Sequence, residues 1–142
     1  MVKTVKKKPV LELWSKLTQA YDMVRKGHTK LVTQHNLTVP QFGVLEVLHE
    51  NDSMPLKKIS ELLLVTGANI TCVVDNLEKE DLVQRVHSKE DRRIINAELT
   101  PKGRQKVDGI LPNYTKNISN LISNLSEVEQ KELVRLLDKL LA

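Results

Sequence analysis

The chain has 142 residues, of which 40% are hydrophobic, 28% are charged and only 3% are aromatic, and its net charge is +4 at pH 7. This length fits one globular domain with an aliphatic core. The single cysteine excludes a disulfide within one chain, and no stretch approaches the roughly 20 apolar residues of a membrane span. We therefore expect a cytoplasmic protein with no membrane partner. The basic balance is compatible with nucleic acid but does not establish it.

The first part of the chain predicts two helices. Apolar residues spaced three or four apart over 10–34 predict a long amphipathic helix. Thr38 and Gln41 have the spacing of a capping box, and Pro40 between them suits a first helical turn. A second helix should therefore start at Thr38 and end at 51–53.

Two short helices joined by a tight turn should follow. The first, over 57–64, is expected to direct three apolar side chains inward: Ile59, Leu62 and Leu63. Thr66 can cap the second, in which apolar residues recur at i, i+3, i+4 and i+7. These residues should form one buried stripe, made of Ile70, Val73, Val74 and Leu77.

The opposite face of the second short helix is small and polar near its N-terminal end. At 100° per residue it comprises Ala68, Cys72, Asp75 and Lys79, flanked by Asn69, Thr71 and Asn76. Asparagine can pair with adenine, and alanine or threonine methyls can meet the methyl of thymine. This face predicts major-groove reading, with these candidate DNA-binding residues: Thr66, Ala68, Asn69, Thr71 and Cys72. The alternative is a helix cap at Thr66 and a plain surface beyond it.

A charged hairpin comes next, with candidate strands over 82–87 and 94–99. Arg93 at its tip can enter a minor groove, where negative potential attracts a guanidinium, and Asp91 can hold that side chain in position. Two further candidate phosphate contacts are Lys89 and Arg92. The alternative is a solvated loop with an ordinary surface ion pair.

Two helices should end the chain. A cap and proline at Thr100 and Pro101 open a helix that is expected to reach Leu125, with a kink at Pro112, and a capping box at 126–129 opens the last helix. The first and the last two helices carry surplus apolar residues. This surplus predicts a two-fold dimer that presents two recognition helices to two half-sites.

The order of these elements and four motifs resemble the MarR family of bacterial winged-helix transcription regulators. The motifs are the helix 66–79, Leu-Val-Gln-Arg at 82–85, Asp-Arg-Arg at 91–93 and Leu-Thr-Pro-Lys-Gly at 99–103. The resemblance implies a mainly α single domain over 1–142, with dimerisation helices at about 9–35 and 104–142. A winged helix-turn-helix DNA-binding lobe should occupy about 38–103.

The resemblance also implies a homodimer on double-stranded DNA with a pseudo-palindromic operator, and repression relieved by a small ligand or by oxidation. Two positions depart from the family pattern. Cys72 stands where many members have arginine, which weakens the case for a contact there. Leu64 stands where many have glycine, which we interpret as a packing variation. Peroxide-sensing members carry a cysteine in the first helix, and 10–34 contains none, which argues against that mechanism.

Trp14, Tyr21 and Tyr114 are candidates for lining a pocket for aromatic ligands in the dimer crevice, with core packing as an equal alternative. A small aromatic or phenolic effector is implied by the resemblance. The four histidines lack a Cys or carboxylate cluster with ligand spacing, so we predict no metal site and expect them either on helix surfaces or in hydrogen bonds between parts of the fold. No cofactor motif is present.

Three functions compete. The first is a dimeric, sequence-specific DNA-binding transcription regulator, a repressor released by a small molecule. The second is a winged-helix module for protein interaction that does not bind DNA. The third is an enzyme with Cys72 as nucleophile, but the chain offers no recognisable histidine partner and no Gly-rich oxyanion loop. We therefore expect a regulator and no enzyme.

Overall fold

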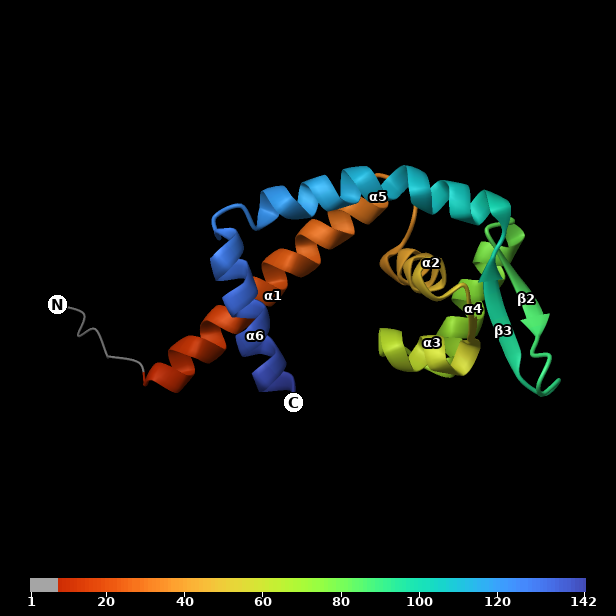
Figure 1. Ribbon diagram of the computed structural model, residues 1–142, viewed down its shortest axis with the longest axis horizontal. Helices are drawn as coiled ribbons and strands as arrows, with labels where there is room; N and C mark the ends of the chain where they lie inside the picture. Colours follow the sequence, from red (N-terminus) through yellow and green to blue (C-terminus); the bar gives the residue numbers. More distant parts are fainter. Residues whose placement is uncertain (1–7) are drawn as a thin grey trace.

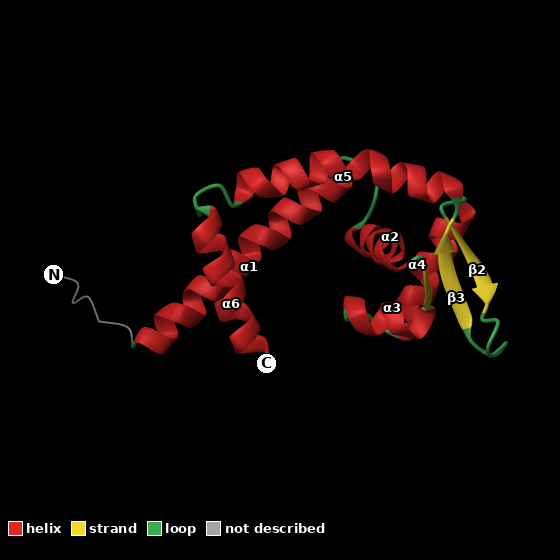
Figure 2. Cartoon of the chain, viewed as in Figure 1, coloured by secondary structure: helices red, strands yellow, loops and turns green. Residues whose placement is uncertain are grey.

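The computed structural model describes residues 8–142, so the first seven residues of the predicted domain lie outside the described range. The fold is mainly α with one small antiparallel sheet, as the sequence predicted (Figure 2). In chain order the elements are α1 (Pro9–Thr33), α2 (Val39–Asn51), β1 (Ser53–Pro55), α3 (Leu56–Leu63), α4 (Gly67–Lys79), β2 (Val83–His87), β3 (Ile95–Leu99), α5 (Pro101–Leu121) and α6 (Glu127–Leu141).

The long helix α5 runs along the top of Figure 1 and connects the two sides of the molecule. On one side lie α1, α6 and the end of α5, and on the other lie α2, α3, α4 and the sheet. In residues 8–142, none of the helices has the length and apolar character that crossing a bilayer would require.

Both predicted capping boxes are confirmed. Thr38 Oγ1 accepts from Gln41 N at 3.3 Å, and Gln41 Oε1 accepts from Thr38 N at 2.9 Å. At the start of α6, Ser126 Oγ accepts from Glu129 N at 3.2 Å, and Glu129 Oε1 accepts from Ser126 N at 3.0 Å. Each pair satisfies two backbone N–H donors that the helix end leaves free, so the helix starts are fixed locally.

The sheet has the strand order β1-β3-β2, with antiparallel pairing throughout. The two hairpin strands were predicted within one residue of their bounds. The strand β1 was missed because three residues are too few to show an alternating pattern. It pairs Met54 with Ala97 and so places the end of α2 against the hairpin.

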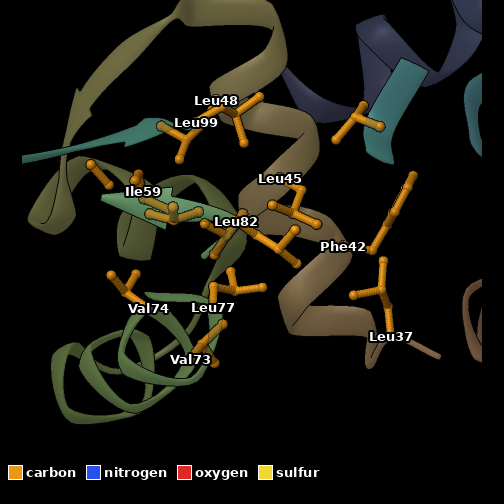
Figure 3. Packing of buried hydrophobic residues seen from close by; sticks show 14 of the residues in the cluster. Leu37, Phe42, Leu45, Leu48, Ile59, Val73, Val74, Leu77, Leu82 and Leu99 are labelled. Carbon is orange, nitrogen blue, oxygen red and sulfur yellow. The ribbon is translucent and has the colours of Figure 1, made fainter. Parts of the chain in front are cut away.

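The core lies in the lobe that contains α2, α3, α4 and the sheet. Side chains from these elements converge in Figure 3, among them Phe42, Leu45 and Leu77, together with Leu82 from the turn before β2. The predicted stripe of α4 is confirmed, since its four apolar residues are all buried. The inward placement of Leu62 is wrong, because this residue is 54% exposed. The other two predicted residues do face inward: Ile59 is buried, and Leu63 packs against the core.

The helix α5 bends in its middle, where Pro112 stands inside it (Figure 1). Proline has no N–H to bond the carbonyl four residues earlier, which explains the bend. The helix ends at Leu121 rather than at Leu125, so that part of the prediction is wrong. Residues 122–125 instead form a turn, in which Leu125 N donates to the Ile122 carbonyl at 3.0 Å, and this turn leads into the capping box of α6.

Candidate nucleic-acid interface

The helix α4 presents the predicted outer face to solvent. Every candidate on it is exposed: Thr66, Ala68, Asn69, Thr71 and Cys72. Thr66 Oγ1 accepts from Asn69 N at 3.2 Å and so caps the helix, and Thr71 Oγ1 donates to the Gly67 carbonyl at 2.9 Å. Both hydroxyls therefore form hydrogen bonds with the backbone of α4. The Asn69 amide forms no hydrogen bond within residues 8–142 and is the polar group free to meet a base edge.

The tip of the hairpin holds one arginine by a carboxylate. Asp91 Oδ1 accepts from Arg93 N at 3.0 Å and from Arg93 Nε at 3.1 Å, and Asp91 Oδ2 accepts from Arg93 Nη2 at 3.2 Å. These hydrogen bonds from the Arg93 side chain and backbone lower the pKa of Asp91. The Arg93 side chain is nevertheless 91% exposed. The result is an oriented guanidinium whose outer surface is open.

Backbone contacts close the loop that carries this pair. Ser88 N donates to the Ile94 carbonyl at 2.9 Å, and Ser88 Oγ accepts from Glu90 N at 3.3 Å. His87 Nδ1 lies 2.9 Å from the Arg92 carbonyl oxygen. Lys89 and the Arg92 side chain are exposed on the same loop. The loop is therefore a shaped basic surface at the end of the sheet opposite to α5 (Figure 1).

Arg85 ties the hairpin to α4, a role that the sequence analysis missed. From β2 its guanidinium donates to Asp75 Oδ1 at 2.6 Å, to Glu78 Oε1 at 2.8 Å and to the Thr71 carbonyl at 3.4 Å. Its side chain is only 23% exposed. One arginine thus fixes the angle between the outer helix face and the wing. Its place in the 82–85 motif was the available signal.

Leu64 occupies the turn between α3 and α4 in a left-handed conformation, with φ 55° and ψ 42°. This conformation costs a residue with a Cβ about 1–2 kcal/mol. The side chain is 92% exposed. The interpretation of Leu64 as a packing variation is therefore wrong, because the side chain packs against almost nothing in the described chain.

Aromatic side chains from three helices meet between the lobes. Tyr114 of α5 and His28 of α1 share a hydrogen bond of 3.0 Å, and both rings pack against Phe42 of α2. Burial lowers the pKa of His28. Burial raises the pKa of Tyr114, with the charge of Glu46 as a second cause. Burial and then the charge of Glu50 raise the pKa of Glu46.

A cavity of about 100 Å³ adjoins this cluster between α1 and α5, lined by Met23, Val24, His28, Leu31, Tyr114, Ile118, Leu121 and Ile122. Trp14 and Tyr21 do not reach it. They lie with Leu17 and Thr18 around an open hollow on α1. Their part in a ligand pocket stays a prediction, and the geometry favours His28 and Tyr114 as pocket residues.

Histidines also link other elements, which confirms their predicted hydrogen-bonding role. His49 of α2 lies 2.8 Å from Asp108 Oδ1 of α5, and beside this pair Arg104 Nη2 donates to Asp52 Oδ1 at 3.1 Å. The bent helix α5 is thereby held to α2. Within residues 8–142, no group of three or more His, Cys, Asp or Glu side chains is arranged to hold a metal ion.

A capped recognition helix, a short helix before it and a hairpin locked to it by an arginine define a winged helix-turn-helix protein. The comparisons with known proteins agree. The model of the MarR family matches residues 37–95. The transcriptional regulator MhqR of Bacillus subtilis (strain 168) is 34% identical over 129 residues, which cover 91% of this chain and 89% of that protein.

Solved structures show the same fold. The transcriptional regulator BldR from Sulfolobus solfataricus has a TM-score of 0.80 and 25% identity, with 95% of this chain and 98% of that chain covered. A MarR variant from E.coli complexed with operator DNA has a TM-score of 0.79 and 20% identity, with 96% and 100% covered. The chain belongs to the MarR family of winged helix-turn-helix transcriptional regulators.

Proposed function

We propose that this chain acts as a homodimeric, sequence-specific DNA-binding repressor that a small ligand releases from its operator. The observation that carries the proposal is the Arg93–Asp91 pair, in which a guanidinium is oriented by two carboxylate oxygens yet is 91% exposed. An arginine held in this way suits the narrow minor groove, where the negative potential is strongest.

The outer face of α4 is the proposed major-groove element. It offers the Asn69 amide and the methyl groups of Ala68 and Thr71, while Cys72 adds a small side chain that lets the helix approach closely. Arg85 supports the proposal indirectly, since it fixes the wing against α4 so that both can engage one half-site. Lys89 and Arg92 would add phosphate contacts.

A second copy of the chain would cover the apolar surfaces of α1 and α6. Val10, Leu13 and Trp14 are exposed on α1, and Leu136 and Leu140 are exposed on α6. Two copies related by a two-fold axis would present two copies of α4 to a pseudo-palindromic operator. The domain division proposed here places dimerisation at about 9–35 and 104–142, and DNA binding at about 38–103.

Ligand release would use the cavity beside His28 and Tyr114. A cavity of about 150 Å³ is known to hold a benzene-sized molecule, so an aromatic ligand would need more room than this cavity of about 100 Å³ offers. Such a ligand would have to separate α1 from α5 and so move the lobes. A coupling of about 1–3 kcal/mol would change operator affinity about 5- to 150-fold. Phenolic acids are the first probes.

The test is salt-dependent binding to a duplex selected from random sequence by the purified full-length chain. Arg93→Ala should weaken binding and reduce the salt slope by about one unit. Asp91→Ala should also weaken binding, although charge counting predicts the opposite, because Arg93 loses its orientation. Lys116→Ala, which removes a charge from α5, is the matched control and should leave the slope unchanged.

Tighter binding by Asp91→Ala would show that the wing is only a basic patch. If the wild-type chain retains no duplex even at low salt, the DNA-binding proposal fails, and a protein-interaction module takes its place. Under the proposed function we expect no enzymatic turnover from the Cys72 thiol.

A further inference from the structure

Three helices of the described chain end in the same backbone turn. In each, a residue of positive φ donates its N–H to the carbonyl three residues earlier, and the next residue donates to the carbonyl five residues earlier. This is the hydrogen-bond pattern of the Schellman motif. The three residues of positive φ are Asn36, Leu64 and Asp81, with φ of 59°, 55° and 58°.

The three turns also share their anchoring. The residue after each turn is apolar and packs inward: Leu37, Val65 and Leu82. The residues of positive φ are exposed in all three. Asparagine and aspartate tolerate this conformation better than other residues with a Cβ, and leucine does not share that tolerance. Two of the three turns therefore use suitable residues, and the backbone gives no reason for leucine in the third.

Within the described chain, the side chain of Leu64 makes almost no contact that would offset the backbone strain. Its side chain is 92% exposed, so it removes almost no apolar surface from water. The conformation is strained and the apolar side chain is solvated. Strain of this kind is typically retained where binding requires it. An occupant outside the described chain would supply the missing contact.

The position of Leu64 indicates that the molecule in contact with its side chain is DNA. It lies two residues before Thr66, the cap of α4, so the two Cα atoms can be at most about 7 Å apart. A duplex seated against Thr66, Ala68 and Asn69 would pass within reach of Leu64. The apolar groups that DNA offers at a groove edge are the thymine methyl and the deoxyribose.

We infer that Leu64 is an apolar DNA contact at the edge of the recognition helix, retained at the expense of helix-end stability. The inference rests on the proposed function and adds a residue to its interface. It makes an unusual prediction: replacing Leu64 by a residue suited to the turn should stabilise the chain and weaken DNA binding at the same time.

The test uses Leu64→Asn and Leu64→Gly in the full-length chain, at one protein concentration. Each should raise the thermal midpoint by about 2–6 °C, because the strain is relieved. Each should weaken binding to the selected duplex about 3- to 10-fold, as expected for losing one partly buried aliphatic contact. Leu64→Asn separates this loss from glycine flexibility, since Asn36 already serves in the same turn.

Two controls complete the design. Leu64→Met keeps an apolar side chain and should keep the affinity within about twofold, because a volume-conserving apolar change is well tolerated. Asn36→Gly alters the equivalent turn away from α4 and should leave DNA affinity unchanged. Replacing each operator thymine by deoxyuridine then distinguishes the two DNA groups: loss of affinity at one position identifies a methyl contact, and loss at none identifies the sugar.

A stabilised Leu64→Asn variant with wild-type affinity would overturn the inference and leave the proposed function standing. A destabilised variant would overturn the strain argument. If the wild-type chain, measured first, binds no selected duplex, the proposed function fails and the inference fails with it.

Discussion

The two sides of the molecule differ in how completely they bury their own apolar residues. Every buried hydrophobic residue of the described chain falls within 31–110, and all of them except Leu31 belong to the core cluster around α2 and the sheet. By contrast, α6 has no buried residue in the described structure, and the first half of α1 exposes Trp14 and its apolar neighbours. The lobe with the wing thus buries its apolar residues within one chain, whereas the flanking helices leave an apolar surface that the second copy would cover in the proposed dimer.

The largest effect on operator affinity is expected from changes to the exposed apolar surface of α6. Leu136→Glu combined with Leu140→Glu should abolish dimerisation, because two carboxylates would be placed in the interface. Operator affinity should fall about 100-fold or more, since the two half-sites are no longer linked. Lys131→Glu makes the same total charge change on the opposite face of α6, and it should change neither dimerisation nor operator affinity. Sedimentation and duplex binding measure both, and a double variant that remains dimeric would refute the assignment of this surface.

A large effect is also expected inside the packed lobe, at Gly103. A Cβ there would overlap the Leu82 carbonyl, which is backbone and cannot move aside. Gly103→Ala should therefore lower the free energy of unfolding by about 1–3 kcal/mol. Gly109→Ala in the same helix meets nothing within 4 Å and should instead stabilise by up to about 1 kcal/mol. Urea unfolding distinguishes the two, and equal effects would mean that the close approach of α5 to Leu82 is unimportant.

A smaller effect is expected at the tie between α4 and the wing. Arg85→Met leaves Asp75 and Glu78 without their shared partner. These carboxylates are about half exposed, so water compensates in part, and we expect a loss of about 1–2 kcal/mol in unfolding free energy. Operator affinity should fall as well, because the wing is no longer held at one angle. If affinity falls without loss of stability, Arg85 acts on DNA directly rather than through the wing.

The smallest effect concerns the junction of the two sides at His28. Burial lowers its folded-state pKa below the ordinary value of about 6.5, so the unfolded chain binds the proton first as the pH falls. Stability is unaffected well above that value and is lost as the pH falls from about 6.5 through the folded-state pKa. His28→Gln should lose less stability over this range than the wild type, whereas Thr29→Gln should behave as wild type. Urea midpoints at several pH values measure this, and equal losses in all three would contradict it.

Local signals predicted the packed lobe well and the contacts between segments poorly. The caps at Thr38 and Thr66 act over three residues, and the apolar stripe of α4 has the regular spacing of a helix, so both can be predicted from the sequence. Arg85 was not recognised as the tie because its partners lie seven and ten residues earlier on another element. The exposure of Leu64 could not be predicted either, since the sequence alone does not show which way an apolar side chain at a turn points.

The central claim, that two chains bind one duplex, is tested most directly by sedimentation velocity at micromolar concentration. The chain alone should sediment as a species of twice 16.2 kDa. With the selected duplex, it should form a complex of two chains per duplex that dissociates as salt is raised. A wild-type monomer at that concentration, or a dimer that never shifts the duplex, would contradict the account.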